Sequence, residues 1–557
     1  MLPPTPALLL SATRAAAILV AILVTAVACS SPASDGDGAS PAASLPRADT
    51  QDLTVAVGAD PFLRPRRSPA TGDEPAGERR AIPDVGVRTD GPNPGIFETL
   101  TRVTPTFGVG PGLAEGWEQV SPTRWRFRLR SGVTFHDGSA FEAGAVVETL
   151  ESVARRQHPP RGMEPGGVTA ADDHTVEIAL TSPNLRLPEQ LADPSTAIRA
   201  AGTIAGAGDD PATTPTGTGP FRFGSYTAGS ELAVEAYAGY WGGAPQLDSL
   251  TFRFGPAQDA SRVLATRQAQ VVGHVPHHTL AQVSGRDRVA ASPPARSAYL
   301  LLNVGGSDDW ATLQDHRVRR AISLAIDRVA LTGAAWPDHG EPNHTLIPPA
   351  VLGTAAAAAV SAPDHDPAAA RALLDEAGWA TGGDGLRRRD GRPLEVTLVL
   401  SRPEELAQAA EAVRAQLAAV GIAVAIPDQG DAPVDRYQRV NDGTFDLFLD
   451  LRGQTDANPC ALCRFFSIRP GGQLTISGTV GAGDAADALF EEAFTVRSID
   501  SARRDAAALM EVVVTDEVVA IPLGSLPNVW LLSPRVQGFE PSAVLGTQRW
   551  EHVWLTV

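Results

Sequence analysis

The stretch TRWRFRLRSGVTFHDGSAF, from Thr123 to Phe141, carries the pattern that decides the fold. Apolar and arginine side chains alternate along RWRFRLR, the period of two that is typical of a strand with one buried and one solvated face. The alternation resumes after a Ser-Gly break and stops at His136-Asp137-Gly138, where the Asp-Gly pair is typical of a tight turn. The stretch therefore predicts an antiparallel strand, a second short extended segment and a turn.

His136 and Asp137 also combine the residue types of a catalytic dyad. Such a dyad needs a nucleophile or a metal ion nearby, and its members are defined by spatial roles rather than by adjacency in sequence. Neighbouring side chains on a turn usually point apart. We therefore interpret the pair as part of the scaffold, and we expect no catalytic residues because the sequence yields no set of nucleophile, base and orienting group.

The length of 557 residues exceeds what one hydrophobic core supports, and roughly 150 residues per domain predicts about three or four units. The net charge of −18 argues against nucleic acid as a partner, because nucleic-acid binders carry basic patches. All 46 basic residues are arginine, which most simply reflects a GC-rich genome. Individual arginines therefore carry less functional weight than usual.

The N-terminus has the form of a secretory signal. Arg14 precedes an apolar run, Ala15–Ala28, which has the length of a signal-peptide core and is too short to span a membrane comfortably. Cys29 follows at once, and AVAC resembles a bacterial lipobox, in which the cysteine is lipidated and becomes the mature N-terminus. We therefore expect residues 1–28 to be a signal peptide and residues 29–51 to be a lipid anchor with a flexible linker. The alternative is an ordinary secretory signal with a chance cysteine.

A βαβ unit is predicted in the second half of the chain. Ser401–Gly421 has apolar residues at spacings of three and four, with a capping box between Ser401 and Glu404 and a glycine at its end. Near-continuous β-prone runs flank it at Leu394–Leu400 and Ile422–Ile426, as suits parallel strands covered on both faces. Two further helices are predicted, at Asp315–Val329 and Asp366–Ala377.

Cys460 and Cys463 are the cysteines that remain after Cys29. In an oxidising compartment, two cysteines three residues apart in a helical turn lie close enough for a small disulfide. A thioredoxin-like redox motif is the alternative, but the surrounding sequence does not read as a small βαβ redox domain. We expect a disulfide.

His274, His277 and His278 lie close together within HVPHH. Imidazole is a good ligand for nickel, zinc or copper, so a metal site is one interpretation. However, Pro276 disrupts helical spacing, and no acidic or cysteine ligand is adjacent. We expect a solvated loop here and no metal site.

Several motifs occur in the order found in one family of proteins. They are PGLAEGWE (residues 111–118), TRWRFRLRSGVTFHDGSAF (123–141), GTGPFRF (217–223), YLLLNV (299–304) with DHRVRRAISLAIDR (315–328), and ARALLDEAGW (370–379). Through them the mature chain resembles the extracytoplasmic solute-binding proteins of ABC importers, specifically the dipeptide, oligopeptide and nickel-binding family, family 5.

This resemblance implies an α/β fold of the hinged, two-lobe periplasmic-binding-protein type (type II), with an extra α+β domain beside the N-terminal lobe. The implied division is lobe I at 52–90, 205–295 and 505–557, the extra domain at 91–204, and the second lobe at 296–504. Ligand would bind between the lobes, and closure would present a new surface to the permease. Neither catalysis nor a cofactor is implied, and we expect a monomer.

The segment LRGQTDANP, Leu451–Pro459, departs from the pattern of peptide-binding members of the family. Those members carry a tryptophan where this chain has Arg452, and an amine-binding aspartate where it has Thr455, although Asp456 is adjacent. The resemblance therefore implies ligand contacts from Arg452, Thr455 and Asp456. Arg452 would suit a ligand with a carboxylate; the alternative is that it is a solvated loop residue.

The function expected from the resemblance is a receptor that is lipid-anchored to the outside of the bacterial cell membrane. It would capture a peptide-like solute and pass it to the permease subunits of an ABC importer. The alternative is a cell-envelope lipoprotein of the same fold that acts through protein contacts rather than uptake.

Overall fold

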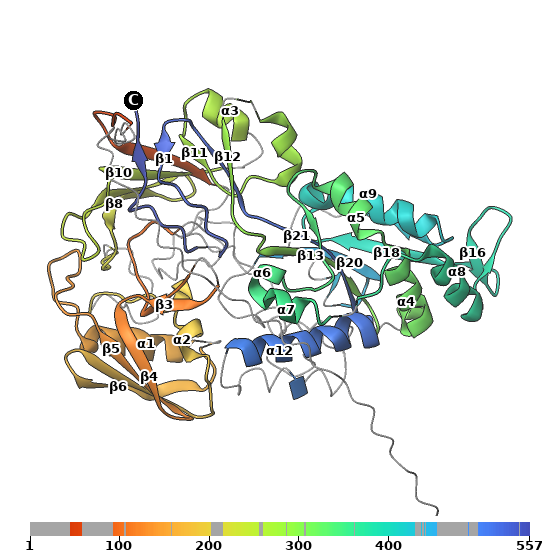
Figure 1. The fold of residues 1–557 in the computed structure, drawn as a ribbon, viewed down its shortest axis with the longest axis horizontal. Coiled ribbons are helices and arrows are strands. Elements are labelled where there is room, and N and C mark those ends of the chain that lie inside the picture. The colour runs from red at the N-terminus through yellow and green to blue at the C-terminus, as the bar shows by residue number, and fades with distance from the viewer. Residues whose placement is uncertain are drawn as a thin grey trace, which may run out of the picture. The chain divides into compact units, whose positions relative to one another are not determined.

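The structure is a computed structural model of the 557-residue chain (Figure 1). It describes residues 45–57, 93–104, 107–156, 159–201, 215–255, 260–283, 285, 287–305, 308–360, 362–428, 436, 439–440, 442–453, 488–489, 499–544 and 546–557. The predicted signal peptide, Cys29 and most of the predicted linker lie outside these residues. None of the helices within the described ranges is both long and apolar enough to cross a membrane.

A seven-stranded sheet holds the ends of the described chain together, in the order β12-β22-β11-β1-β10-β9-β8. Its strands are β1 (Asp52–Val57), β8 (Phe221–Thr227), β9 (Glu231–Ala236), β10 (Ser249–Phe254), β11 (Val271–Val272), β12 (Arg288–Ala291) and β22 (Val529–Leu532). β1 is parallel to both neighbours, and its alternate side chains are buried in a cluster that includes Phe252 and Trp550. We call this the first sheet.

The arginine-rich stretch forms the centre of a separate four-stranded antiparallel sheet, in the order β4-β5-β7-β6. Its strands are β4 (Ala114–Ser121), β5 (Arg124–Leu129), β6 (Met163–Asp172) and β7 (Thr175–Leu180), and α1 (Ala143–Ala154) packs against it. The alternation is confirmed, since the apolar residues of β5 are buried and its arginines lie on the other face. Arg126 there pairs with Glu177 at 2.7 Å, an exposed contact of small energetic value. In Figure 1 this part runs from orange to yellow.

A six-stranded mixed sheet, the second sheet, has the order β14-β21-β13-β20-β18-β19. Its strands are β13 (Arg296–Leu302), β14 (Glu341–Pro342), β18 (Glu395–Leu400), β19 (Ala423–Ala425), β20 (Leu447–Gly453) and β21 (Ala520–Leu526). The predicted βαβ unit is confirmed, because β18 is parallel to β19 and α9 (Pro403–Ala418) connects them. Two clusters of buried side chains share the strands of this sheet, as expected for strands covered on both faces.

The predicted capping box at the start of α9 is wrong. The residue before the helix is Arg402, no side chain caps it, and the buried Ser401 hydroxyl has no hydrogen-bond partner among the described residues. The ring of Pro403 disfavours the helical conformation at the preceding Arg402, which has φ −136° and ψ 83°, so the helix starts one residue later than the box requires.

The single helix predicted at Asp315–Val329 is two helices, α4 (His316–Ala325) and α5 (Arg328–Ala335). The Asp327 side chain accepts a hydrogen bond from the backbone N–H of Ala330 and so begins the second helix. By contrast, Asp366 caps α8 (Pro367–Glu376) as the sequence predicts.

The remaining strands and α-helices of the described residues lie outside these three sheets. They are β2 (Thr101–Val103), β3 (Val109–Pro111), β15 (Ala380–Thr381), β16 (Arg387–Arg389), β17 (Arg392–Pro393), β23 (Val536–Gln537), β24 (Trp554–Leu555), α2 (Leu187–Gln190), α3 (Ala260–Ala265), α6 (Pro349–Leu352), α7 (Thr354–Ala357) and α12 (Ile499–Met510).

Strand pairing moves one predicted boundary. The chain was expected to return to lobe I near residue 505, but β21 pairs with β13 in the second sheet, and only β22 pairs in the first. The return therefore lies at Pro527-Asn528. The reason is burial: Val513, Val514 and Ile521 pack in the clusters of the second sheet. The rest of the division into lobes stays a prediction.

Candidate functional site

Two chain segments pass between the first and second sheets side by side. One joins β12 to β13 and the other joins β21 to β22. The backbone N–H of Ser292 donates to the Asn528 carbonyl at 3.0 Å, and the Asn528 N–H donates back to the Ser292 hydroxyl at 3.0 Å. Hinges between lobes are a few element-terminal residues that absorb backbone rotation. This pair of crossings has that form.

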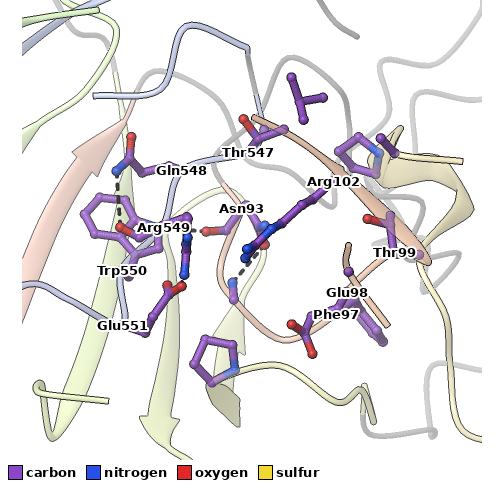
Figure 2. Close-up of a pocket in the computed structure, with 18 of the residues that line it drawn as sticks. Asn93, Phe97, Glu98, Thr99, Arg102, Thr547, Gln548, Arg549, Trp550 and Glu551 are labelled. Atoms are coloured by element: carbon purple, nitrogen blue, oxygen red, sulfur yellow. Dashed lines mark hydrogen bonds and ion pairs between the residues drawn. The ribbon is translucent and has the colours of Figure 1, made fainter. Parts of the chain in front are cut away.

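Two adjoining cavities lie near these crossings. The first has a volume of about 120 Å³ and is lined by residues from the β2–β3 region and by the segment 546–551 (Figure 2). The second has a volume of about 200 Å³ and includes Pro293, which lies in the first crossing. Both share four lining residues: Arg102, Val103, Thr547 and Arg549. The two cavities therefore adjoin along this shared wall, and the second one reaches the first crossing at Pro293.

Glu98 is a partly buried residue whose carboxylate lies in the wall of the first cavity. It accepts hydrogen bonds from Trp241 Nε1 at 2.8 Å, from the Thr218 hydroxyl at 2.9 Å and from the Tyr240 hydroxyl at 3.0 Å. Burial raises the pKa of Glu98 to about 7, although these three donors oppose the shift. Burial and the neighbouring Glu98 charge also raise the pKa of Tyr240. The carboxyl group is therefore a fixed, satisfied part of the wall.

Backbone packing around Glu98 is close. A Cβ atom on Gly217 would lie 2.0 Å from the carbonyl oxygen of Ile96, and one on Gly219 would lie 2.1 Å from that of Gly95. Only glycine permits such an approach. The motif GTGPFRF thus brings Thr218 against Glu98.

His136 belongs to the same scaffold. Its Nδ1 accepts from the Gly217 N–H at 3.3 Å, and its Nε2 bonds the Gly219 carbonyl oxygen at 3.0 Å, so the ring is the neutral Nε2–H tautomer. Burial lowers the pKa of His136. Asp137 accepts from the N–H and hydroxyl of Ser139 within its own turn. The structure confirms a scaffold role for the pair.

Polar side chains from two segments converge on the first cavity. Figure 2 shows Arg102 extending from its strand toward Asn93 and Arg549. The Asn93 Oδ1 accepts from the Gly95 N–H at 2.9 Å, and Arg549 Nε pairs with Glu551 at 2.6 Å. Arg102 is exposed and has no hydrogen-bond or ion-pair partner among the described residues.

Arg452 lies at the end of β20, in the second sheet. Its Nε pairs with Asp450 at 2.6 Å, and Asp450 also accepts from the Tyr299 hydroxyl at 3.2 Å. The Asp450 side chain is 1% exposed and that of Arg452 is 23% exposed. The alternative that Arg452 is a solvated loop residue is therefore wrong, while its contact with a ligand stays a prediction. Thr455, Asp456, Cys460 and Cys463 lie outside the described residues.

The HVPHH segment is not the solvated loop that was expected. His277 is buried, its Nε2 bonds the Pro527 carbonyl oxygen in the second crossing at 3.1 Å, and burial lowers its pKa to about 4. The ring of His274 lies 5.1 Å from that of Trp530. Within the described ranges, no group of three or more His, Cys, Asp or Glu side chains is arranged to hold a metal ion. The segment packs against the hinge.

Sequence reasoning missed Glu98, Arg102 and Arg549. One signal for Glu98 was present in the sequence, because it directly follows the apolar pair Ile96 and Phe97, and both of these are buried in the structure. Nothing in the local sequence marked the two arginines, because the segments that they occupy meet only in the fold.

Comparisons with known proteins identify the family. Residues 108–469 match the family model described as bacterial extracellular solute-binding proteins, family 5 middle. The glutathione-binding protein GsiB of Pectobacterium atrosepticum is 31% identical over 272 residues, which cover 46% of this chain and 50% of that protein. The chain thus spans about half the length of the curated relatives that it matches.

Solved structures share the fold. NikA from Brucella suis, in complex with Fe(III)-EDTA, has a TM-score of 0.69 and 23% identity, with 83% of this chain and 94% of that chain covered. The oligopeptide-binding protein AppA from Bacillus subtilis, in complex with a nonapeptide, has a TM-score of 0.67 and 19% identity, with 91% and 100% covered. These likenesses confirm the predicted α/β fold class. The family model covers more than half of the chain and describes binding proteins, not enzymes. The chain belongs to the bacterial extracellular solute-binding proteins of family 5.

Proposed function

We propose that the chain is the solute-binding receptor of an ABC importer and captures a peptide-like small solute between two lobes. The first sheet belongs to one lobe and the second sheet to the other, with the extra domain around the four-stranded sheet. The receptor delivers its solute to the permease subunits of the importer. Lipid attached to Cys29 anchors it outside the cell membrane.

The paired crossings carry this proposal. Adjacent hydrogen-bonded segments at Ser292 and Asn528 allow the two sheets to rotate about one line while each keeps its own core. The second cavity, lined by Arg102 and Arg549, reaches Pro293 at this line. A ligand stabilises a closed form only if it interacts better with that form than with the open one, as a solute does when residues of both lobes contact it after closure.

The relatives support the class of solute. GsiB is named for binding glutathione, a tripeptide, and AppA was solved with a nonapeptide. On the positions that the family resemblance gives, Arg452, Thr455 and Asp456 contact the solute from the second lobe. Cys460 and Cys463, the cysteines that remain after Cys29 in an exported chain, form a disulfide. Because Arg452 balances the buried Asp450, removing its charge will affect folding as well as binding.

A thermal-shift screen tests the receptor function. Reduced glutathione, di- and tripeptides, opine-like compounds, sugars and divalent metal salts are each added to the mature protein. We expect a peptide-like solute to raise the melting temperature, because a ligand at 100 times its Kd stabilises the native state by about 2.7 kcal/mol. Stabilisation by sugars or metal salts alone, with every peptide-like solute inactive, would contradict the proposed solute class.

Lipid anchoring gives a separate prediction. Cys29→Ser should move the protein from the membrane fraction to the soluble fraction of a bacterial host, because the thioether that carries the lipid no longer forms. The wild-type protein should carry the added mass of the lipid by mass spectrometry, with Cys460→Ser as a control that keeps it. Membrane retention of the Cys29→Ser protein, or a wild-type protein without added mass, would contradict the anchor.

A further inference from the structure

We infer that Arg102 binds an anionic group of the solute, a carboxylate, in the first cavity, with Asn93 and Arg549 beside it. This inference deepens the proposed function and rests on it, because it assigns a chemical class to one end of the captured solute.

The hydrogen-bonding balance of the wall favours an acceptor as ligand. The side-chain acceptors are engaged: Glu98 has three donors, the Asn93 Oδ1 has the Gly95 N–H, and Glu551 has Arg549. The donors are not. No described residue accepts from Arg102 or from the Asn93 Nδ2. A carboxylate offers two acceptor oxygens and would complete both groups.

The charges point the same way. Arg549 is neutralised by Glu551, and the Glu98 carboxylate is held by its three hydrogen-bond donors. Among the described residues that line this cavity, Arg102 is therefore the cation without a counter-charge. Glu540 lines only the second cavity and is exposed. An arginine fork matches the two oxygens of a carboxylate, and such charge-assisted bonds are the strong ones.

Arg452, the arginine that the family resemblance pointed to, is less suited to this role. It already has a buried carboxylate partner at 2.6 Å, so a ligand carboxylate would compete with Asp450. Arg102 has no such partner among the residues that the structure describes.

The sizes of the cavities indicate how the solute lies. A volume of about 120 Å³ is well below that of sites for whole small molecules, which span roughly 300 to 1,000 Å³. The first cavity therefore accepts an end group only. The solute continues past Arg102 into the second cavity and reaches the hinge at Pro293.

The test compares free acids with amides. Reduced glutathione and trialanine, each as the free acid and as the C-terminal amide, are titrated by calorimetry into wild type, Arg102→Gln, Arg102→Lys and Arg253→Gln. Arg253 is an exposed arginine on β10 outside both cavities, so its variant controls for the loss of one charge.

We expect Arg102→Gln to weaken binding of the acids about 10- to 100-fold and binding of the amides less than about threefold. Arg102→Lys should recover part of the loss, and Arg253→Gln should match wild type in affinity. The Arg102 variants should keep the melting temperature of wild type, because Arg102 has no hydrogen-bond or ion-pair partner among the described residues. Equal affinity of wild type for acid and amide, or equal losses for both in Arg102→Gln, would overturn the carboxylate site. An uncharged solute from the screen that binds wild type and Arg102→Gln with equal affinity would also overturn the carboxylate site. That result would still support the proposed receptor function. If no probe or screened solute binds wild type, both fall.

Discussion

Replacing Gly219 by alanine is expected to lower the free energy of unfolding by about 3 kcal/mol or more. The new Cβ would lie 2.1 Å from the Gly95 carbonyl oxygen and 2.8 Å from its carbon, and both are backbone atoms. A side chain could rotate away, but here the backbone itself must move. That movement would disturb the hydrogen bond of Gly219 to His136 and that of Thr218 to Glu98.

Denaturant unfolding followed by circular dichroism measures this loss. Gly333→Ala is a matched control, because Gly333 lies inside α5 and, apart from its chain neighbours and the backbone of its own helix, no described atom lies within 4 Å of its added Cβ. Alanine there should gain about 0.5 to 1 kcal/mol. A loss below about 1 kcal/mol for Gly219→Ala would show that the segment relaxes freely.

Glu98→Gln is expected to stabilise the protein at pH 8 but not at pH 5. Burial raises the folded-state pKa of Glu98 from 4.5 to about 7, so between these values the native state holds a proton that the unfolded chain has released. The stability contributed by this group is therefore fully present below pH 4.5 and is lost as pH rises through 7. The loss approaches about 3 kcal/mol at pH 8, and glutamine, which does not titrate, avoids it.

The geometry accommodates the amide. Its oxygen can accept from Trp241 and Thr218, and its NH₂ can donate to the Tyr240 hydroxyl. Glu98→Ala is the contrasting variant, because it leaves these donors unpaired and should destabilise the protein at both pH values. Stability is measured at pH 5 and pH 8, and contributions of other titrating groups cancel in the difference from wild type. A difference between glutamine variant and wild type that is independent of pH would contradict the raised pKa.

The strands and helices with strong local patterns were predictable. The alternation around Phe127, the βαβ unit around α9 and the cap at Asp366 follow from spacing and turn chemistry within a few residues. The family motifs added the order of the lobes. The start of α9 was misjudged because Pro403 keeps Arg402 out of the helical conformation, so the helix begins one residue after the expected place.

The candidate site was less predictable, because its residues are distant in sequence. Arg102 and Arg549 are separated by more than four hundred positions, yet they line the same two cavities. The partner of Arg452, Asp450, is only two residues away on the same strand. The ion pair between them depends on the burial of Asp450, and the spacing of the sequence does not predict that burial. His277 was misjudged for a similar reason, since the Pro527 carbonyl that it bonds comes from a remote segment.

Because the chain crosses twice between the two sheets, these sheets can be completed at different stages of protein synthesis. β22 lies between β12 and β11 in the first sheet and pairs with both. These two strands, which come earlier in the chain, are therefore not joined in the sheet until residues 529–532 have been synthesised. The second sheet, by contrast, is formed by residues 296–526, a continuous excursion that closes on itself. A nascent chain that ends before Val529 therefore contains every described strand of the second sheet. In its first sheet, β12 is still separated from the other strands. The segment that contains β22 joins β11 to β12 and so completes the first sheet. A nascent chain exported before this segment is made still exposes unpaired strand edges.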